Sequence, residues 1–161
     1  MKYVIIGNSA AGIGAVEAIR KYDKGGSITI VSDEKHHTYS RPLISYLIYG
    51  KTDLQKMKYR PDDFYTKNNV TTLFGIKAVK VDSENKQVIL EDKTMLEYDK
   101  LLIATGSRPF VPLMENMEKI KNCFTFMSLD DAINIQKYLT YETKTLIIGG
   151  GLIGLKAAEG I

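Results

Sequence analysis

The chain is poor in cysteine and has no long apolar run. Its 161 residues include a single cysteine, Cys123, and no tryptophan. One cysteine excludes an intramolecular disulfide and a metal cage built from cysteines. No apolar run approaches the roughly 18 residues that a membrane span requires, and the N-terminus has none of the features of a signal peptide. We therefore expect no membrane partner and a cytoplasmic location.

Charge of either sign is also modest. The 22 Lys and Arg residues exceed the 19 Asp and Glu residues only slightly, for a net charge of +3. The lysines are scattered along the sequence. This balance is compatible with a small anionic ligand but gives no basis for a nucleic-acid partner.

Two short apolar runs each break into a glycine-rich turn. They are "YVIIGNSAAGIG", residues 3–14, and "TLIIGGGLIG", residues 145–154. The first run reads as a buried strand, and residues 9–22 have helical character with cations near the end of the predicted helix. Residues 27–31, "SITIV", form a second predicted strand. This order of strand, helix and strand is a βαβ unit.

The first turn carries a dinucleotide-binding pattern. Gly7, Ser9 and Gly12 occupy the three positions of a G-x-G-x-x-G motif, with serine in the middle. The glycines allow the tight turn and close helix packing, and the helix N-terminus offers N–H groups to a pyrophosphate. Asp33 and Glu34 follow the second strand, about 20 residues later, where a carboxylate can bind the adenosine ribose. A tight turn without a ligand is the alternative interpretation.

The second turn, at Gly149, Gly151 and Gly154, is a full match to the same motif. We expect a strand at 145–148 and a helix from Gly151, but the chain ends before another strand can complete the unit. We therefore expect a piece of a longer protein. Residues 1–111 would form a first domain and residues 112–161 the truncated beginning of a second.

The remaining pattern predicts an α/β fold of three layers. A parallel sheet would carry helices on one face and an antiparallel meander on the other. Cys123 lies in "NCFTFM", a run that looks buried. The further predicted strands are 69–73, 78–81, 88–90, 95–98 and 101–104, and the further predicted helices are 41–49, 60–68 and 129–139.

Three stretches carry a family resemblance: "GNSAAG" at 7–12, "SDEKHHTYSRP" at 32–42 and "YDKLLIATGSRP" at 98–109. The chain resembles the FAD-dependent pyridine nucleotide-disulfide oxidoreductase superfamily. It is most similar to the NADH:rubredoxin reductase branch and to the N-terminal part of the assimilatory NAD(P)H nitrite reductase large subunit. The resemblance implies a Rossmann-like FAD/NAD(P)-binding fold, with FAD at the first turn and NAD(P)H at the second.

The resemblance also implies which residues line the cofactors. No catalytic residue is assigned. The implied FAD-binding residues are Gly7, Ser9, Ala10, Ala11 and Gly12 at the pyrophosphate, Asp33 and Glu34 at the ribose, Arg41 and Pro42 along the flavin, Ala78 at the adenine, and Thr105, Gly106 and Arg108 over the dinucleotide. Gly149, Gly151 and Gly154 would begin the NAD(P)H site.

The chain departs from its relatives in three respects, two of them at Tyr46 and one at Lys156. Many relatives carry a redox cysteine where Ser45 is followed by Tyr46, and some ferredoxin-reductase relatives have a lysine at about Tyr46. Many have a glutamate at the position of Lys156.

The reaction implied by the resemblance is hydride transfer from NAD(P)H to FAD. Electrons would then pass to a redox partner, either a rubredoxin-like iron protein or a nitrite reductase centre in the same polypeptide.

Other interpretations stay open. The chain could be a non-catalytic module that binds an adenine dinucleotide, or part of an NADH oxidase-type flavoprotein.

We expect the 161 residues alone to be inactive and to form a dimer or swapped assembly through the exposed strand at 145–148. We predict no metal site, because His36 and His37 are adjacent in a loop and no further ligands follow at metal-binding spacing.

Overall fold

The chain divides into two compact units. The computed structural model describes residues 1–161, apart from the side chain of Glu118. One unit comprises Met1–Tyr39 with Lys58–Gly106, and the other comprises Ser40–Met57 with Ser107–Ile161. The predicted division into domains at 111 and 112 stays a prediction.

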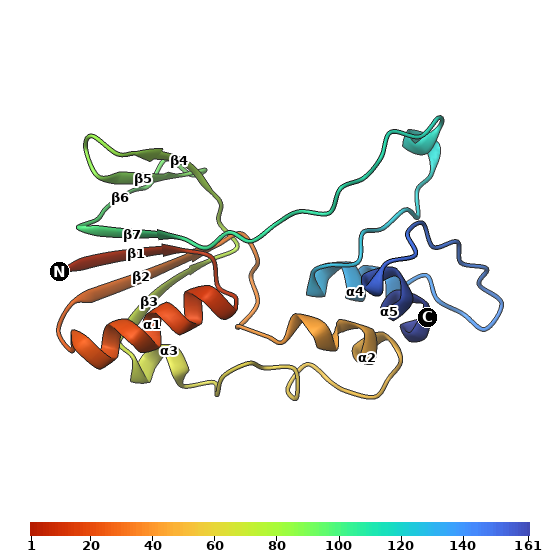
Figure 1. Cartoon of the computed structure of the whole chain (residues 1–161), viewed down its shortest axis with the longest axis horizontal. Coiled ribbons are helices and arrows are strands. Elements are labelled where there is room, and N and C mark those ends of the chain that lie inside the picture. Colours follow the sequence, from red (N-terminus) through yellow and green to blue (C-terminus); the bar gives the residue numbers. More distant parts are fainter. The chain divides into compact units, whose positions relative to one another are not determined.

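A parallel sheet forms the middle layer of the first unit (Figure 1). Its strand order is β3-β2-β1-β7, and every neighbouring pair is parallel. Helices α1 and α3 cover one face and the antiparallel meander β4-β5-β6 covers the other, which confirms the predicted fold class. The bounds are β1 Lys2–Ile6, α1 Ala10–Tyr22, β2 Ser27–Ser32, α3 Phe64–Lys67, β3 Val70–Phe74, β4 Ala78–Asp82, β5 Gln87–Leu90, β6 Met95–Glu97 and β7 Lys100–Ile103.

Strand β1 buries side chains on both faces of this sheet. Ile5 belongs to the core cluster that includes Ile13 and Val16 of α1, whereas Val4 and Ile6 belong to the cluster shared with the meander. A strand covered on both faces needs a continuous apolar run, because successive side chains point to opposite faces. The sequence "YVII" supplies such a run.

The second unit consists of short helices. The bounds are η1 Arg41–Leu43, α2 Ile44–Ile48, η2 Met117–Lys119, α4 Leu129–Gln136 and α5 Leu152–Gly160. Helix α2 packs against both α4 and α5. Ser128 and Asp131 form a capping box at the start of α4, and the side-chain amide of Gln136 donates to the carbonyl oxygen of Leu47 at 3.0 Å.

Two expectations for the second unit are wrong. Residues 145–148 form no strand among the described residues, because no other segment pairs with them; their backbone groups lack the partners that a strand requires. Cys123, expected to be buried, is exposed. The surrounding run is apolar, but no helix or strand holds it against a core.

Two helices are shorter than expected. Helix α3 begins at Phe64 and not at Arg60. Arg60 precedes Pro61, and the proline ring disfavours helical backbone angles in the residue before it. Helix α4 ends at Gln136 and not at Leu139. Among the described residues, no helix is both long and apolar enough to cross a membrane.

Candidate functional site

The first glycine turn is built around close backbone contacts. Gly7 has φ of +124°, and a Cβ there would lie 2.1 Å from the carbonyl oxygen of Ala104. A Cβ on Gly12 would lie 2.0 Å from the carbonyl oxygen of Gly7. Position 7 therefore requires glycine because of its positive φ and its close contact with Ala104. Position 12 requires glycine because α1 approaches the backbone of Gly7 there.

The middle position of the turn has different requirements. Ser9 is the N-cap of α1, its backbone is extended, and its side chain makes no capping hydrogen bond. An extended residue with φ of −111° tolerates any side chain, which explains why serine can replace glycine here. The described first turn of α1 contains no acidic residue. Its free N–H groups and partial positive charge can therefore bind an anion.

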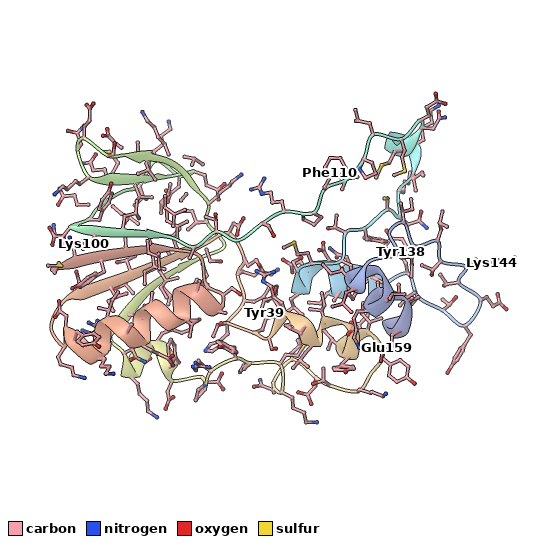
Figure 2. The ribbon with its side chains drawn as sticks, in the orientation of Figure 1. Tyr39, Lys100, Phe110, Tyr138, Lys144 and Glu159 are labelled. Carbon is pink, nitrogen blue, oxygen red and sulfur yellow. The ribbon has the colours of Figure 1, made fainter. Side chains whose placement is uncertain are left out.

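Strand β2 ends beside this turn, and the two acidic residues that follow it differ in their surroundings. Glu34 is half-buried, and its Oε2 accepts a hydrogen bond from the Tyr39 hydroxyl at 2.5 Å. Asp33 is exposed, and the described residues offer its carboxylate no hydrogen-bond or ion-pair partner. Asp33 is thus the carboxylate available to a ligand, whereas Glu34 already holds the loop through Tyr39, labelled in Figure 2.

The parallel sheet brings three of the predicted segments to one edge. Gly7 follows β1, Asp33 follows β2 and Thr105 follows β7, and these strands are neighbours in the order β2-β1-β7. The carboxyl ends of parallel strands meet at the same edge of a sheet, where open α/β folds bind their ligands. Thr105 and Gly106 are both exposed there, and Gly106 has a positive φ of +69°.

Ala78 lies at the start of β4 and is half-buried against the core between the sheet and the meander. The pairing of β4 with β5 is irregular between Ala78 and Lys80. A bulge of this kind leaves backbone groups outside the ladder. Ala78 itself pairs with Leu90, and Val79 is the residue left outside the register. The role of Ala78 toward an adenine stays a prediction.

A polar cluster that the sequence pattern did not predict lies behind the turn. The Tyr65 hydroxyl donates to Oδ1 of Asn8 at 2.7 Å and accepts from the backbone N–H of Thr38 at 3.2 Å. Burial raises the pKa of the Tyr65 phenol, so it keeps its proton and stays a donor. Asn8 lies inside the glycine motif and could have been noticed, whereas no local pattern marks Tyr65.

The second glycine turn repeats the geometry of the first. Gly149 has the same φ as Gly7, +124°, and a Cβ on Gly154 would lie 1.8 Å from the carbonyl oxygen of Gly149. Gly151 is the extended N-cap of α5, with open space at its Cβ position. The three predicted residues are therefore brought together in a turn of the expected conformation, although the preceding residues form no strand.

The remaining predicted residues belong to the second unit. The guanidinium of Arg41 is half-buried and donates to the carbonyl oxygen of Met127 at 3.1 Å. Pro42 and Arg108 are exposed. Their predicted roles at a cofactor stay predictions.

Comparison with known proteins decides the family. Residues 1–160 match the Pyridine nucleotide-disulphide oxidoreductase family. The chain belongs to this family. It is 36% identical over 159 residues to the NAD(P)H nitrite reductase of Bacillus subtilis (strain 168), covering 98% of this chain and 20% of that protein. It is 31% identical over 160 residues to the NADH-rubredoxin oxidoreductase of Clostridium acetobutylicum, covering 99% of this chain and 41% of that protein.

Solved structures of the family have the same fold. The crystal structure of NADH:rubredoxin oxidoreductase from Clostridium acetobutylicum matches with a TM-score of 0.88 at 30% identity, covering 99% of this chain and 41% of that one. Putidaredoxin reductase in its covalent complex with putidaredoxin matches with a TM-score of 0.88 at 31% identity, covering 99% of this chain and 39% of that one. The chain thus spans less than half the length of these relatives.

Lys156 and Tyr46 connect the second glycine turn to helix α2. The Nζ of Lys156 in α5 lies 5.4 Å from the ring centroid of Tyr46 in α2. The same Nζ lies 2.5 Å from Oε2 of Glu159, which is labelled in Figure 2, and this pairing raises the pKa of Lys156. The contact ties the helix of the second glycine turn to α2 by a cation–π interaction.

Proposed function

We propose that this chain is the FAD-binding part of an NAD(P)H-dependent flavoprotein oxidoreductase that passes electrons to a redox partner. One observation carries the proposal. The first glycine turn presents an uncapped helix N-terminus at the same sheet edge as the exposed carboxylate of Asp33. An adenine dinucleotide needs both features, the first for its pyrophosphate and the second for its ribose.

The residues of the first unit would divide the binding between them. The backbone from Gly7 to Gly12 would hold the pyrophosphate. Asp33 would hold the ribose hydroxyls, and Glu34 would support the loop through Tyr39. The other proposed contacts are Ala78 at the adenine, Thr105, Gly106 and Arg108 over the dinucleotide, and Arg41 and Pro42 along the flavin. Gly149, Gly151 and Gly154 would begin an NAD(P)H site.

FAD, when bound, would accept a hydride from NAD(P)H and release electrons singly or in pairs. The only cysteine in the 161 residues is Cys123, so this segment contains no pair of thiols to relay them. We therefore propose an acceptor with its own redox centre. The relatives named NAD(P)H nitrite reductase and NADH-rubredoxin oxidoreductase support two classes of acceptor, a nitrite reductase centre and a rubredoxin-like iron protein.

An NADH oxidase-type flavoprotein is a second candidate. The NADH oxidase of Methanocaldococcus jannaschii is 32% identical over 169 residues, covering all of this chain and 38% of that protein. A purely binding role without turnover is the third. We propose that the 161 residues alone bind FAD weakly and do not oxidise NADH, because they span only part of the relatives' length.

The substitution Ser9→Asp tests the anion site without disrupting the start of α1. Aspartate is a good N-cap, so α1 should form as before or more stably. Its charge would face the bound pyrophosphate. We expect the affinity for FAD and for ADP to fall by about 10-fold or more, the size of one lost charge-assisted contact. Binding is measured by NMR titration and by the visible spectrum of flavin retained after gel filtration.

The matched control is Ser83→Asp, which adds the same charge at an exposed position between β4 and β5. This control should bind both ligands as the unchanged chain does. Equal affinity of Ser9→Asp and the unchanged chain would refute the anion site. If the unchanged chain binds neither FAD nor ADP, the proposed function itself is refuted.

We also propose that the chain self-associates through its second unit, as a dimer or swapped assembly. Large apolar side chains are exposed there: Phe110 is 90% exposed, Leu113 fully, Leu146 84% and Leu152 75%. Figure 2 labels Phe110. Exposed apolar surface of this kind favours association. Light scattering should give a mass above one chain, and a strictly monomeric mass at all concentrations would contradict this.

A further inference from the structure

We propose that Tyr65 and Asn8 form a positioning pair that sets the ribose-binding loop at a fixed place beside the glycine turn. This inference rests on the proposed function and deepens it. Recognition of the two adenosine ribose hydroxyls by Asp33 would depend on the Tyr65 hydroxyl, although Tyr65 itself touches no ligand.

Three hydrogen bonds make the connection. The Tyr65 hydroxyl, in α3, donates to Oδ1 of Asn8 at 2.7 Å. The backbone N–H of Thr38 donates to the same hydroxyl at 3.2 Å. The side-chain amide of Asn8 donates to the carbonyl oxygen of His36 at 3.2 Å. Asn8 stands between Gly7 and Ser9, so the glycine turn is linked at two points to the loop after β2.

The link continues along that loop to the carboxylate. The Tyr39 hydroxyl donates to Oε2 of Glu34 at 2.5 Å, which closes the loop over residues 34–39. The Glu34 carbonyl oxygen accepts from the N–H of Gly75 at 3.3 Å. Asp33 directly precedes this closed loop and follows the last residue of β2. Its backbone is therefore held from both sides, while its carboxylate stays exposed.

The Tyr65 hydroxyl can be removed while the ring keeps its contacts in the core. The residue is 9% exposed, and its ring packs edge-on against His37, Phe64 and Phe74 at centroid distances of 5.0, 5.3 and 5.4 Å. Tyr65→Phe keeps these ring contacts. It removes the partner of a buried backbone N–H at Thr38 and of Oδ1 of Asn8, and both groups must then shift to find new partners.

The experiment compares ADP with 2′,3′-dideoxy-ADP, which keeps the pyrophosphate but lacks both ribose hydroxyls. NMR titration of the 161-residue chain gives both dissociation constants. We expect the unchanged chain to prefer ADP by about 10-fold, the size expected for hydrogen bonds to a carboxylate. Tyr65→Phe should reduce this preference to below about 3-fold. Asn8→Ala should do the same, and the double variant should lose no more than either single one.

Two further variants calibrate the ratio. Asp33→Asn, which removes the carboxylate, should abolish the preference. Tyr3→Phe makes the same chemical change as Tyr65→Phe, because the Tyr3 hydroxyl donates to Oδ2 of Asp23 at 3.0 Å. Tyr3 lies near the start of β1, at the opposite edge of the sheet from the glycine turn. Removal of the Tyr3 hydroxyl should lower the stability of the first unit and leave the preference for ADP over the dideoxy analogue unchanged.

The outcomes separate the inference from the proposed function. If Tyr65→Phe weakens both ligands equally and keeps the ratio, Tyr65 has only a structural role and the inference is overturned. An unchanged ratio and affinity would overturn it as well. If the unchanged chain binds ADP without preferring it over the dideoxy analogue, Asp33 is not the ribose ligand and the inference fails. If the unchanged chain binds neither nucleotide, the proposed function fails first.

Discussion

Gly12 and Gly14 are two residues apart in α1, yet replacement by alanine should have opposite effects. A Cβ on Gly12 would lie 2.0 Å from the carbonyl oxygen of Gly7. A Cβ on Gly14 would have no heavy atom within 4 Å, apart from its own helix and neighbours. The same chemical change therefore meets backbone at one position and open space at the other.

The two magnitudes follow from these surroundings. At Gly12 the turn must move by roughly 1 Å, but Gly7 is held by a 2.8 Å hydrogen bond from its N–H to Val31 and by its close approach to Ala104. Overpacking at such a rigid place lowers the free energy of unfolding by about 3 kcal/mol. The higher helix propensity of alanine relative to glycine raises it by about 1 kcal/mol. Gly12→Ala should thus destabilise the first unit by about 2 kcal/mol, and Gly14→Ala should stabilise it by about 0.5–1 kcal/mol.

Hydrogen exchange followed by mass spectrometry measures the stability of the first unit by itself. A local measurement is needed because two compact units need not unfold together. Peptides from β1 and β2 should exchange about 30-fold faster in Gly12→Ala and several-fold slower in Gly14→Ala. The reasoning is refuted if Gly12→Ala exchanges as slowly as the unchanged chain. Equally faster exchange in Gly12→Ala and Gly14→Ala would also refute it, because the clash with Gly7 would then not explain the effect at Gly12.

Two further predictions concern the end of α1. Arg20 is 9% exposed and donates to four backbone carbonyl oxygens at 2.6–3.1 Å; Arg20→Met should destabilise the first unit by about 3 kcal/mol, measured by the same exchange, and a loss below about 1 kcal/mol would contradict this. The backbone N–H of Gly26 and the Tyr3 hydroxyl lower the pKa of Asp23 below its usual 3.8. Its stabilising effect is present above pH 3.8 and lost as the pH falls through the folded-state pKa. Asp23→Asn should therefore show a shallower loss of stability in acid unfolding, and an unchanged slope would count against this assignment.

Much of the fold could be predicted because the deciding interactions are local. The apolar run of β1 and the glycine turn after it lie within a dozen residues, and the helix expected at residues 9–22 begins at its N-cap, Ser9. A cap, a turn and a buried strand each depend on a few neighbouring residues. The glycine motif therefore gave the position of the anion site, and the family resemblance gave the fold.

Only the tertiary structure decided how that site is held and which carboxylate is available. Asp33 and Glu34 are equivalent in the sequence pattern, and a hydrogen bond from Tyr39 distinguishes them. The Tyr65 hydroxyl reaches Asn8 across 57 positions of sequence, a contact that no local periodicity can indicate. Residues 145–148 have the composition of a strand but form none, because a strand exists only when another segment pairs with it. The sequence by itself determined the local turns and the order of the elements. Long-range pairing and packing decided which groups are engaged and which stay free for a ligand.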